Sequence, residues 1–140
     1  YNISPYEVEL EITESILIDD FKEITEKLVI LRDLGIRISL DDFGTGYSSL
    51  SYLKGLPIDT LKIDKSFIDT VITDKNTRII TESIIYMVKK LGCETIAEGV
   101  EHEDQYRYLN EIGCDNIQGF FLGKPMPSEE IEGLLATIHS

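Results

Sequence analysis

The sequence predicts an α/β protein in which about five parallel strands alternate with crossover helices. Apolar and polar residues alternate in several short stretches, as in strands, and apolar residues recur every three or four positions between them, as in helices. The same junction, a helix end, a glycine and the start of a strand, occurs at Leu34-Gly35-Ile36, Leu91-Gly92-Cys93 and Ile112-Gly113-Cys114. Short helix-to-strand turns of this kind are typical of a parallel sheet with helical crossovers.

Strands are predicted where apolar and polar residues alternate. In the first, Val8, Leu10 and Ile12 alternate with glutamates, so that one face of the strand is apolar. The predicted strands cover residues 7–12, 36–42, 60–64, 93–97 and 117–122.

Helices are predicted where the spacing of apolar residues changes to three or four. In the longest, Ile80, Ile84 and Met87 lie on one stripe and Gly92 follows its end. Ser128 is expected to cap the last helix. The predicted helices cover residues 20–34, 49–56, 74–91, 103–112 and 128–138.

Length and composition restrict the classes of function. A chain of 140 residues suits one domain, and its net charge of −13 repels the phosphate backbone of DNA, which is therefore not an expected partner. No apolar run reaches the roughly 20 residues of a membrane-spanning helix. Cys93 and Cys114 form no disulfide framework and are expected to be small buried residues at strand starts. These features favour a reducing, cytoplasmic compartment.

Polar residues gather where the predicted strands end. In parallel α/β folds this rim binds ligands. The residues expected there are Glu11, Asp41, Asp42, Lys62, Asp64, Glu98 and Gln118. An all-oxygen set without histidine or cysteine favours Mg²⁺ or Mn²⁺ over Zn²⁺, and His102 and His139 are expected to be solvated rather than ligands.

Two alternatives stay open at this stage. Asp41 and Asp42 precede a glycine-containing loop, so they could belong to a solvated turn instead of a metal site. Lys62 could form a structural ion pair, or it could orient a metal-bound water and stabilise charge on a phosphate.

Five motifs together resemble one family, the EAL-domain cyclic-di-GMP phosphodiesterases. They occur in order and extend over essentially all 140 residues. The motifs are LEITES around Glu11 and Glu14, DDFGTGYSS from Asp41, LKID around Lys62, AEGVE around Glu98 and QGFFLGKP from Gln118. The resemblance implies a modified TIM barrel that hydrolyses cyclic di-GMP to linear pGpG in second-messenger signalling.

The resemblance also implies roles for single residues. Glu11 and Asp41 would bind a first metal ion, and Asp41, Asp42 and Glu98 a second one, with Mg²⁺ or Mn²⁺ as the metal. Lys62, Glu98 and Gln118 would be catalytic, and Gln118 and Glu101 would bind substrate. Glu14 would hold a loop that couples the active site, with a neighbouring helix, to a homodimer interface. This loop consists of Phe43, Gly44, Thr45, Gly46, Tyr47, Ser48 and Ser49.

The Glu-Ala-Leu motif that names the family does not occur in the chain. A full (β/α)₈ barrel needs about 250 residues, so residues 1–140 are expected to be the C-terminal part of a single EAL domain. The first metal site would then lack two ligands, and the chain alone is expected to be inactive and to self-associate through its open sheet. The intact protein could also be membrane-anchored, with this part in the cytoplasm.

Two other functions remain possible. The domain could bind cyclic di-GMP or mediate dimerisation without turnover, which a degenerate upstream motif would favour. It could also be a Mg²⁺-dependent barrel enzyme of another chemistry, but that alternative does not explain the DDFGTGYSS segment.

Overall fold

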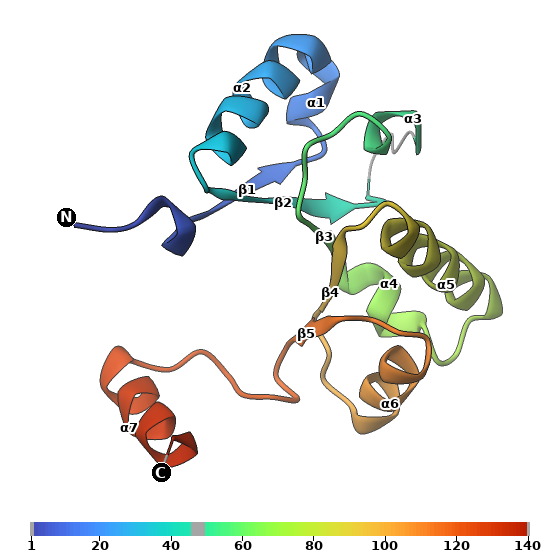
Figure 1. Cartoon of the computed structure of the whole chain (residues 1–140). Helices are drawn as coiled ribbons and strands as arrows, with labels where there is room; N and C mark the ends of the chain where they lie inside the picture. Colours follow the sequence, from blue (N-terminus) through green and yellow to red (C-terminus); the bar gives the residue numbers. More distant parts are fainter. Residues whose placement is uncertain (1, 46–49, 140) are drawn as a thin grey trace.

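The computed structural model describes residues 2–45 and 50–139. Its strands form one parallel sheet in the order of the sequence, as predicted. The strands are β1 (Glu9–Thr13), β2 (Arg37–Phe43), β3 (Thr60–Ile63), β4 (Glu94–Glu98) and β5 (Asn116–Gln118). Figure 1 shows that the sheet curves and that α2, α5 and α6 lie on its outer side, while α7 stands apart.

The helices follow the strands, as crossovers require. They are α1 (Ile16–Asp19), α2 (Phe21–Asp33), α3 (Leu50–Leu53), α4 (Lys65–Thr70), α5 (Lys75–Lys90), α6 (Glu103–Glu111) and α7 (Ser128–Ile138), with the short 3₁₀ helix η1 (Pro5–Glu7) before β1. Asp20, Asp64 and Asp74 cap α2, α4 and α5 by accepting backbone N–H bonds. The glycines of the three predicted junctions, Gly35, Gly92 and Gly113, have φ of 99°, 78° and 86°, as helix-ending glycines do.

The structure corrects several predicted boundaries. Strand β2 ends at Phe43, one residue beyond its predicted end at Asp42. Strand β5 ends at Gln118, because the chain turns at Gly119 and the N–H of Leu122 bonds the Gly119 carbonyl at 3.1 Å. The apolar residues that follow therefore imitate a strand in sequence without forming one.

Helix boundaries also differ from the predicted ones. Helices α1 and α4 were not predicted, since four and six residues are too few to show a helical period. Helix α3 is shorter than predicted. Pro127, rather than Ser128, is the capping position of α7, and Ser128 is its first helical residue.

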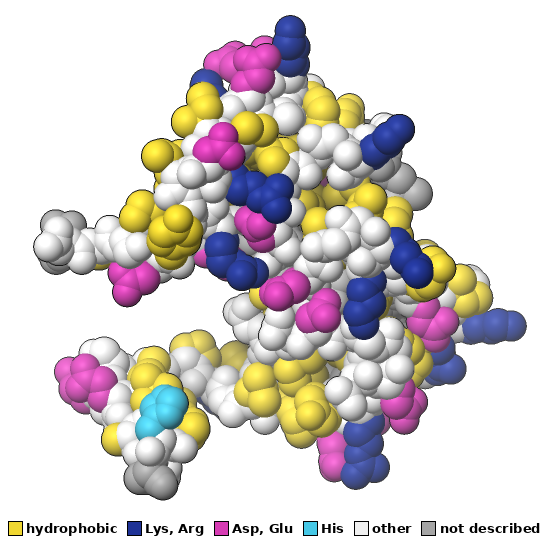
Figure 2. Space-filling model, in the orientation of Figure 1, with side chains coloured by type: hydrophobic (Ala, Val, Ile, Leu, Met, Phe, Trp, Pro, Cys, Tyr) yellow, Lys and Arg dark blue, Asp and Glu magenta, His cyan; other side chains and the backbone are white. Residues whose placement is uncertain are grey.

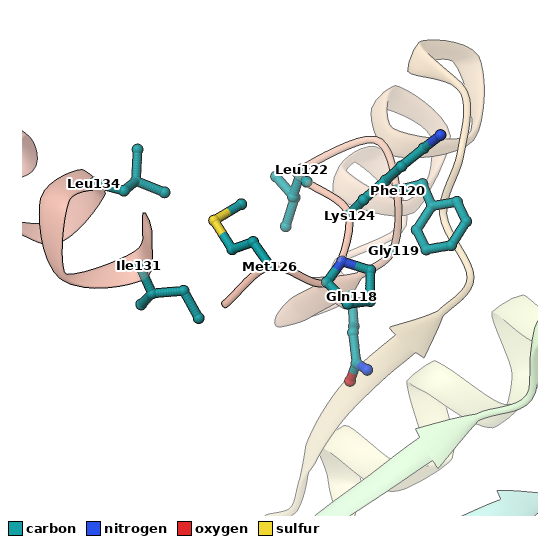
Figure 3. Close-up of a pocket in the computed structure, with 10 residues that line it drawn as sticks. Gln118, Gly119, Phe120, Leu122, Lys124, Met126, Ile131 and Leu134 are labelled. Atoms are coloured by element: carbon teal, nitrogen blue, oxygen red, sulfur yellow. The ribbon is translucent and has the colours of Figure 1, made fainter. Parts of the chain in front are cut away.

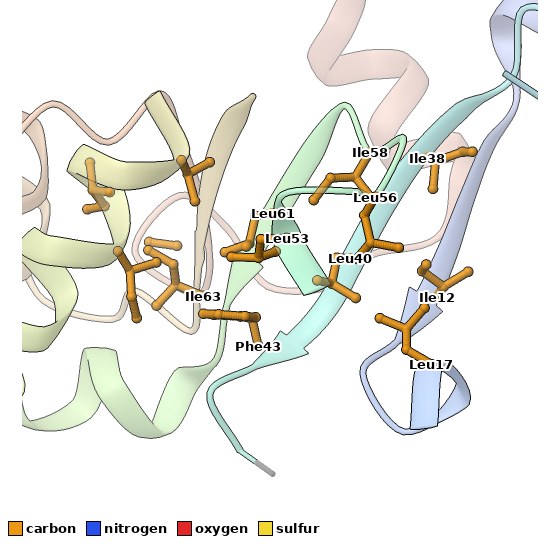
Figure 4. Packing of buried hydrophobic residues seen from close by; sticks show 14 of the residues in the cluster. Ile12, Leu17, Ile38, Leu40, Phe43, Leu53, Leu56, Ile58, Leu61 and Ile63 are labelled. Carbon is orange, nitrogen blue, oxygen red and sulfur yellow. The ribbon is translucent and has the colours of Figure 1, made fainter. Parts of the chain in front are cut away.

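The two faces of the sheet differ in polarity. Apolar side chains face the helices and form one core, in which Ile38, Leu40, Leu61 and Ile63 are at most 1% exposed. Figure 4 shows that this core brings together β1, β2, β3 and the segments between them. The opposite face carries in-register polar residues, because side chains alternate along a strand. These residues are Glu11, Ser39, Thr60, Lys62, Glu98 and Gln118.

The sheet is open in the described part of the chain, where β1 and β5 each pair with a single neighbour. Large apolar side chains lie exposed beside it, including Ile30, Leu34, Phe120 and Leu122. Figure 2 shows hydrophobic surface over three parts of the molecule, namely the N-terminal segment, α2 and α7. Within residues 2–45 and 50–139, no helix is long and apolar enough to span a membrane.

Both cysteines lie just before a strand and are half-buried rather than fully buried. Burial raises the pKa of both the Cys93 and the Cys114 thiols. The Cys93 thiol contacts the Ile58 carbonyl at 3.3 Å, in keeping with a packing role at the base of the sheet.

Candidate metal-binding and catalytic site

Three carboxylates converge at the carboxyl ends of β2 and β4. Asp41, Asp42 and Glu98 each place an oxygen within 4.8 Å of the others. Adjacent strand residues normally point to opposite faces, so Asp41 and Asp42 would be separated in a regular strand. Instead, the β2–β3 register shifts between Leu40 and Phe43, and Asp42 has a φ of 56°. This irregularity directs both side chains to one cluster.

The backbone of Asp42 is in the left-handed region, where asparagine and aspartate are the most tolerated side chains apart from glycine. No other described non-glycine residue has a positive φ. The N–H of Asp42 donates to Asp41 Oδ1 at 2.8 Å, which stabilises the left-handed backbone at Asp42. Both side chains are half-buried within a strand, which excludes the solvated turn as an explanation of the pair.

The negative charge of Asp41 raises the pKa of the other two carboxylates. Burial, and then the charge of Asp41, raise the pKa of Glu98 to about 7. The charge of Asp41, followed by burial, also raises the pKa of Asp42. Because the cluster contains only oxygen donors and repels itself when ionised, it fits a hard divalent cation.

Lys62 is a buried cation at the same rim, and its side chain is only 8% exposed. Its Nζ forms an ion pair with Glu11 Oε1 and lies 3.6 Å from Glu98 Oε1. Burial lowers the pKa of Lys62, but Glu11 and Glu98 outweigh this effect and raise it, so the amine is charged at neutral pH. The ion pair therefore exists, and it keeps the amine beside the carboxylate cluster.

Glu11 is positioned by this lysine. Its carboxylate pairs with Lys62 and is not part of the three-carboxylate cluster that contains Asp41. The structure thus brings together Asp41, Asp42 and Glu98. The Lys62 amine contacts both Glu98 of this cluster and Glu11 outside it.

Glu14 lies under the loop that follows β2. It is buried, and its Oε2 accepts a bond from the N–H of Gly44 at 3.4 Å. Phe43 is buried, and the Thr45 hydroxyl donates to the Asp42 carbonyl at 2.7 Å. The remaining predicted loop residues, Gly46, Tyr47, Ser48 and Ser49, lie outside the described residues.

The two predicted substrate-binding residues stand at the same rim. Gln118 is exposed at the end of β5 and pairs in register with Glu98. Glu101 is held by Lys65, whose Nζ lies 3.0 Å from Glu101 Oε1. His102 and His139 are exposed, and neither belongs to the carboxylate cluster.

A groove of about 400 Å³ opens beside Gln118, between the segment after β5 and α7. Figure 3 shows Phe120, Leu122 and Met126 around it, with the Gln118 amide directed away from them. The lining contains no carboxylate. The groove therefore adds apolar surface near the rim but no metal ligand.

Comparison with known proteins identifies the family. Residues 1–125 match the family described as EAL domain. The chain belongs to the EAL domain family. It is 51% identical over 132 residues to the signaling protein YkoW of Bacillus subtilis, covering 94% of this chain and 16% of YkoW. The chain therefore spans about a sixth of that relative.

Solved EAL structures share the fold. The PaMucR phosphodiesterase, solved with c-di-GMP, is 43% identical and superimposes with a TM-score of 0.87, over 92% of this chain and 52% of PaMucR. Klebsiella pneumoniae BlrP1 is 32% identical with a TM-score of 0.79, over 85% of this chain and 30% of BlrP1. It was solved with c-di-GMP and manganese, and also with calcium. EAL domains are TIM-like barrels, and the five strands of this EAL chain form a partial barrel.

One residue at the rim of this EAL chain had no role in the sequence interpretation. Asp64 caps α4 by accepting the Ser66 N–H at 2.9 Å. Hydrogen bonds with the Ser66 side chain and then with its N–H lower the pKa of Asp64. Its charge and a hydrogen bond also help to raise the pKa of Asp42. The signal in sequence is an aspartate directly after a buried strand and one residue before Lys65, at a helix start.

Proposed function

We propose that residues 1–140 form the C-terminal part of an EAL domain that hydrolyses cyclic di-GMP to linear pGpG with Mg²⁺ or Mn²⁺. The observation that carries this proposal is the convergence of Asp41, Asp42 and Glu98 within 4.8 Å, beside a buried lysine. It is supported by family membership and by relatives solved with c-di-GMP. Hydrolysis of cyclic di-GMP would end the signal that this second messenger carries.

The roles of the residues follow from their chemistry. Asp41, Asp42 and Glu98 would hold a divalent cation, which supplies Lewis acidity toward a phosphodiester oxygen and toward water. Lys62, fixed by Glu11, presents a positive charge where negative charge grows on the phosphate. The Gln118 amide, in register with Glu98, can donate to a phosphate oxygen and orient the substrate. Glu101 would contact the substrate from the adjacent loop.

The deciding experiment measures conversion of cyclic di-GMP to pGpG with Mg²⁺ or Mn²⁺. It compares the 140-residue chain with the same chain joined to its upstream sequence. We expect activity only in the extended protein, because the chain alone presents a single three-carboxylate cluster in its described part. Activity of the 140-residue chain would contradict the requirement for upstream ligands, and activity in neither would contradict the enzyme.

A second candidate function is binding of cyclic di-GMP, or dimerisation, without turnover. One observation favours it: Lys62 engages Glu11, so Glu11 is not combined with Asp41 in a second acidic cluster. Equilibrium dialysis with the extended protein separates the two functions. Tight binding of cyclic di-GMP without pGpG formation would select the binding module.

We further propose that the domain works as a cytoplasmic homodimer, with the loop after Asp42 and a neighbouring helix at the interface. The bond from the Gly44 N–H to Glu14 supports a link between this loop and the site, because Gly44 follows the metal-site strand directly. Light scattering of the extended protein tests dimerisation, and fractionation of cells tests its location.

A further inference from the structure

Gln105 is a buried polar side chain whose amide oxygen and amide nitrogen are both hydrogen-bonded near the rim. It is 5% exposed and lies in the first turn of α6. Its Oε1 accepts the N–H of Glu101 at 2.9 Å and the N–H of His102 at 3.1 Å. Its Nε2 donates to the carbonyl of Ile68 at 3.2 Å. One amide therefore links the loop after β4 to α4.

These bonds exceed what a helix start requires. A side chain at this position commonly reaches back to the N–H of the capping residue, here His102. The bonds to Glu101 and to Ile68 join two other segments. Helix α4 follows the strand of Lys62, and the loop of Glu101 follows the strand of Glu98. Gln105 thus connects the segments that follow two site residues.

The loop between Glu98 and Glu101 is confined on its other sides as well. Gly99 has a φ of 73°, and a Cβ there would lie 2.4 Å from the side chain of Lys65. Val100 is fully buried, and its N–H donates to the Gln118 carbonyl at 3.1 Å. Its carbonyl accepts the Phe121 N–H at 2.9 Å. The loop is therefore held by α4, by β5 and by Gln105 together.

We propose that Gln105 is a positioning residue that holds the Glu98 carboxylate in the metal-binding cluster by fixing the loop after β4 to α4. This inference rests on the proposed metal site. Removing the amide would leave the Glu101 and His102 N–H groups and the Ile68 carbonyl without this partner inside the protein, and the loop would shift to find others. Such supporting groups typically change metal affinity about 10–100-fold.

The test is Mn²⁺ affinity of the full-length protein, measured from the EPR signal of free Mn²⁺. Gln105→Met keeps the length of the side chain but removes its hydrogen bonds, and we expect Mn²⁺ binding to weaken about tenfold or more. Gln105→Glu keeps an acceptor for both N–H groups but puts a second acceptor in place of the donor to the Ile68 carbonyl. It breaks the link to α4 alone, so it should weaken binding less. This second variant decides the matter if Gln105→Met does not fold.

The matched control is Asp74→Ala, which removes the cap of α5 where Asp74 accepts the Thr77 N–H at 2.8 Å. It should lower the melting temperature without changing Mn²⁺ affinity. Unchanged Mn²⁺ affinity in both Gln105 variants, or equal weakening in Asp74→Ala, would overturn the positioning role. Absence of Mn²⁺ binding by the unsubstituted protein, or binding unaffected by Asp42→Asn, would instead overturn the proposed metal site.

Discussion

At the scale of single residues, the site depends on groups held in unfavourable states. Asp42 has a left-handed backbone, and its carboxylate is crowded by that of Asp41. Both features cost folding free energy, and such strain persists where function needs the geometry. The positive charge of Lys62 partly offsets the repulsion at Asp42. Substitutions at these positions should therefore lower activity without lowering the stability of the fold.

Asp42→Asn should nearly abolish hydrolysis of cyclic di-GMP by the extended protein. A metal ligand should matter more than an outer partner, whose loss costs about 10–100-fold. The substitution also relieves repulsion with Asp41, so the melting temperature without metal should not fall. Asp74→Asn removes the same charge while keeping a capping residue, and it serves as the control. Turnover near that of the unsubstituted enzyme would refute the ligand role of Asp42.

Lys62→Ala should lower kcat about a hundredfold and change KM much less, because the amine acts on charge that develops in the transition state. Steady-state kinetics of the extended protein measures both. The exposed Lys27, which pairs with Glu23 on α2, offers a control as Lys27→Ala with unchanged kinetics. An effect of Lys62→Ala on KM alone would indicate a binding role.

The raised pKa of Glu98 predicts an unusual pH dependence of stability. Its pKa rises from 4.5 to about 7 on folding, so the folded state binds more protons between these values. With EDTA present, stability should fall as pH rises from about 4.5 to 7, by at most about 3 kcal/mol from this group. Glu98→Gln should flatten that slope, and added Mn²⁺ should reverse the loss. If the metal-free protein instead became more stable from pH 4.5 to 7, and Glu98→Gln removed that gain, the raised pKa of Glu98 would be wrong.

At the scale of elements, the short segments that follow the strands hold the rim residues in position. The turn after β5 packs backbone against backbone: a Cβ on Gly119 would lie 2.2 Å from the Val100 carbonyl oxygen. Tyr106 of α6 stacks on Phe121 with ring centroids 5.3 Å apart, which holds the turn against α6. The position of Gln118 therefore depends on a close approach that only glycine allows.

Gly119→Ala should destabilise the protein, by about 2 kcal/mol or more, because the contact is with backbone that cannot move aside. Gly133→Ala is the matched control, since a Cβ at Gly133 of α7 meets nothing within 4 Å. That substitution should stabilise by about 0.5–1 kcal/mol through helix propensity. Chemical denaturation of the extended protein measures both, and equal effects would contradict the proposed contact.

Element order was largely predictable because periodicity is local. All five strands and the helices α2, α3, α5, α6 and α7 were predicted near their observed places. The misses have local causes too: α4 is too short to show a period, and Phe120 to Leu122 have strand-like residues after a turn that Gly119 imposes. The rim residues followed from the rule that parallel strands end together.

At the scale of the whole molecule, the described sheet leaves two edges and large apolar side chains exposed. Open edges and apolar patches favour association. We expect the 140-residue chain to self-associate or to be poorly soluble, and the extended protein to form a defined species. Gel filtration and NMR test this, and a stable monomer with a well-dispersed spectrum of the short chain would contradict it.

The succession of strands and helices, and the set of acids at the strand ends, depend on neighbours along the chain and could be predicted from the residues alone. The way those acids combine could not, because it depends on packing between distant segments. The shifted register between β2 and β3 and the left-handed Asp42 bring Asp41 and Asp42 to one cluster with Glu98, although alternation alone would separate them. Lys62 of β3 likewise takes Glu11 of β1 as its partner across the intervening strand β2. Register and pairing are set by contacts between distant segments, which no local period records.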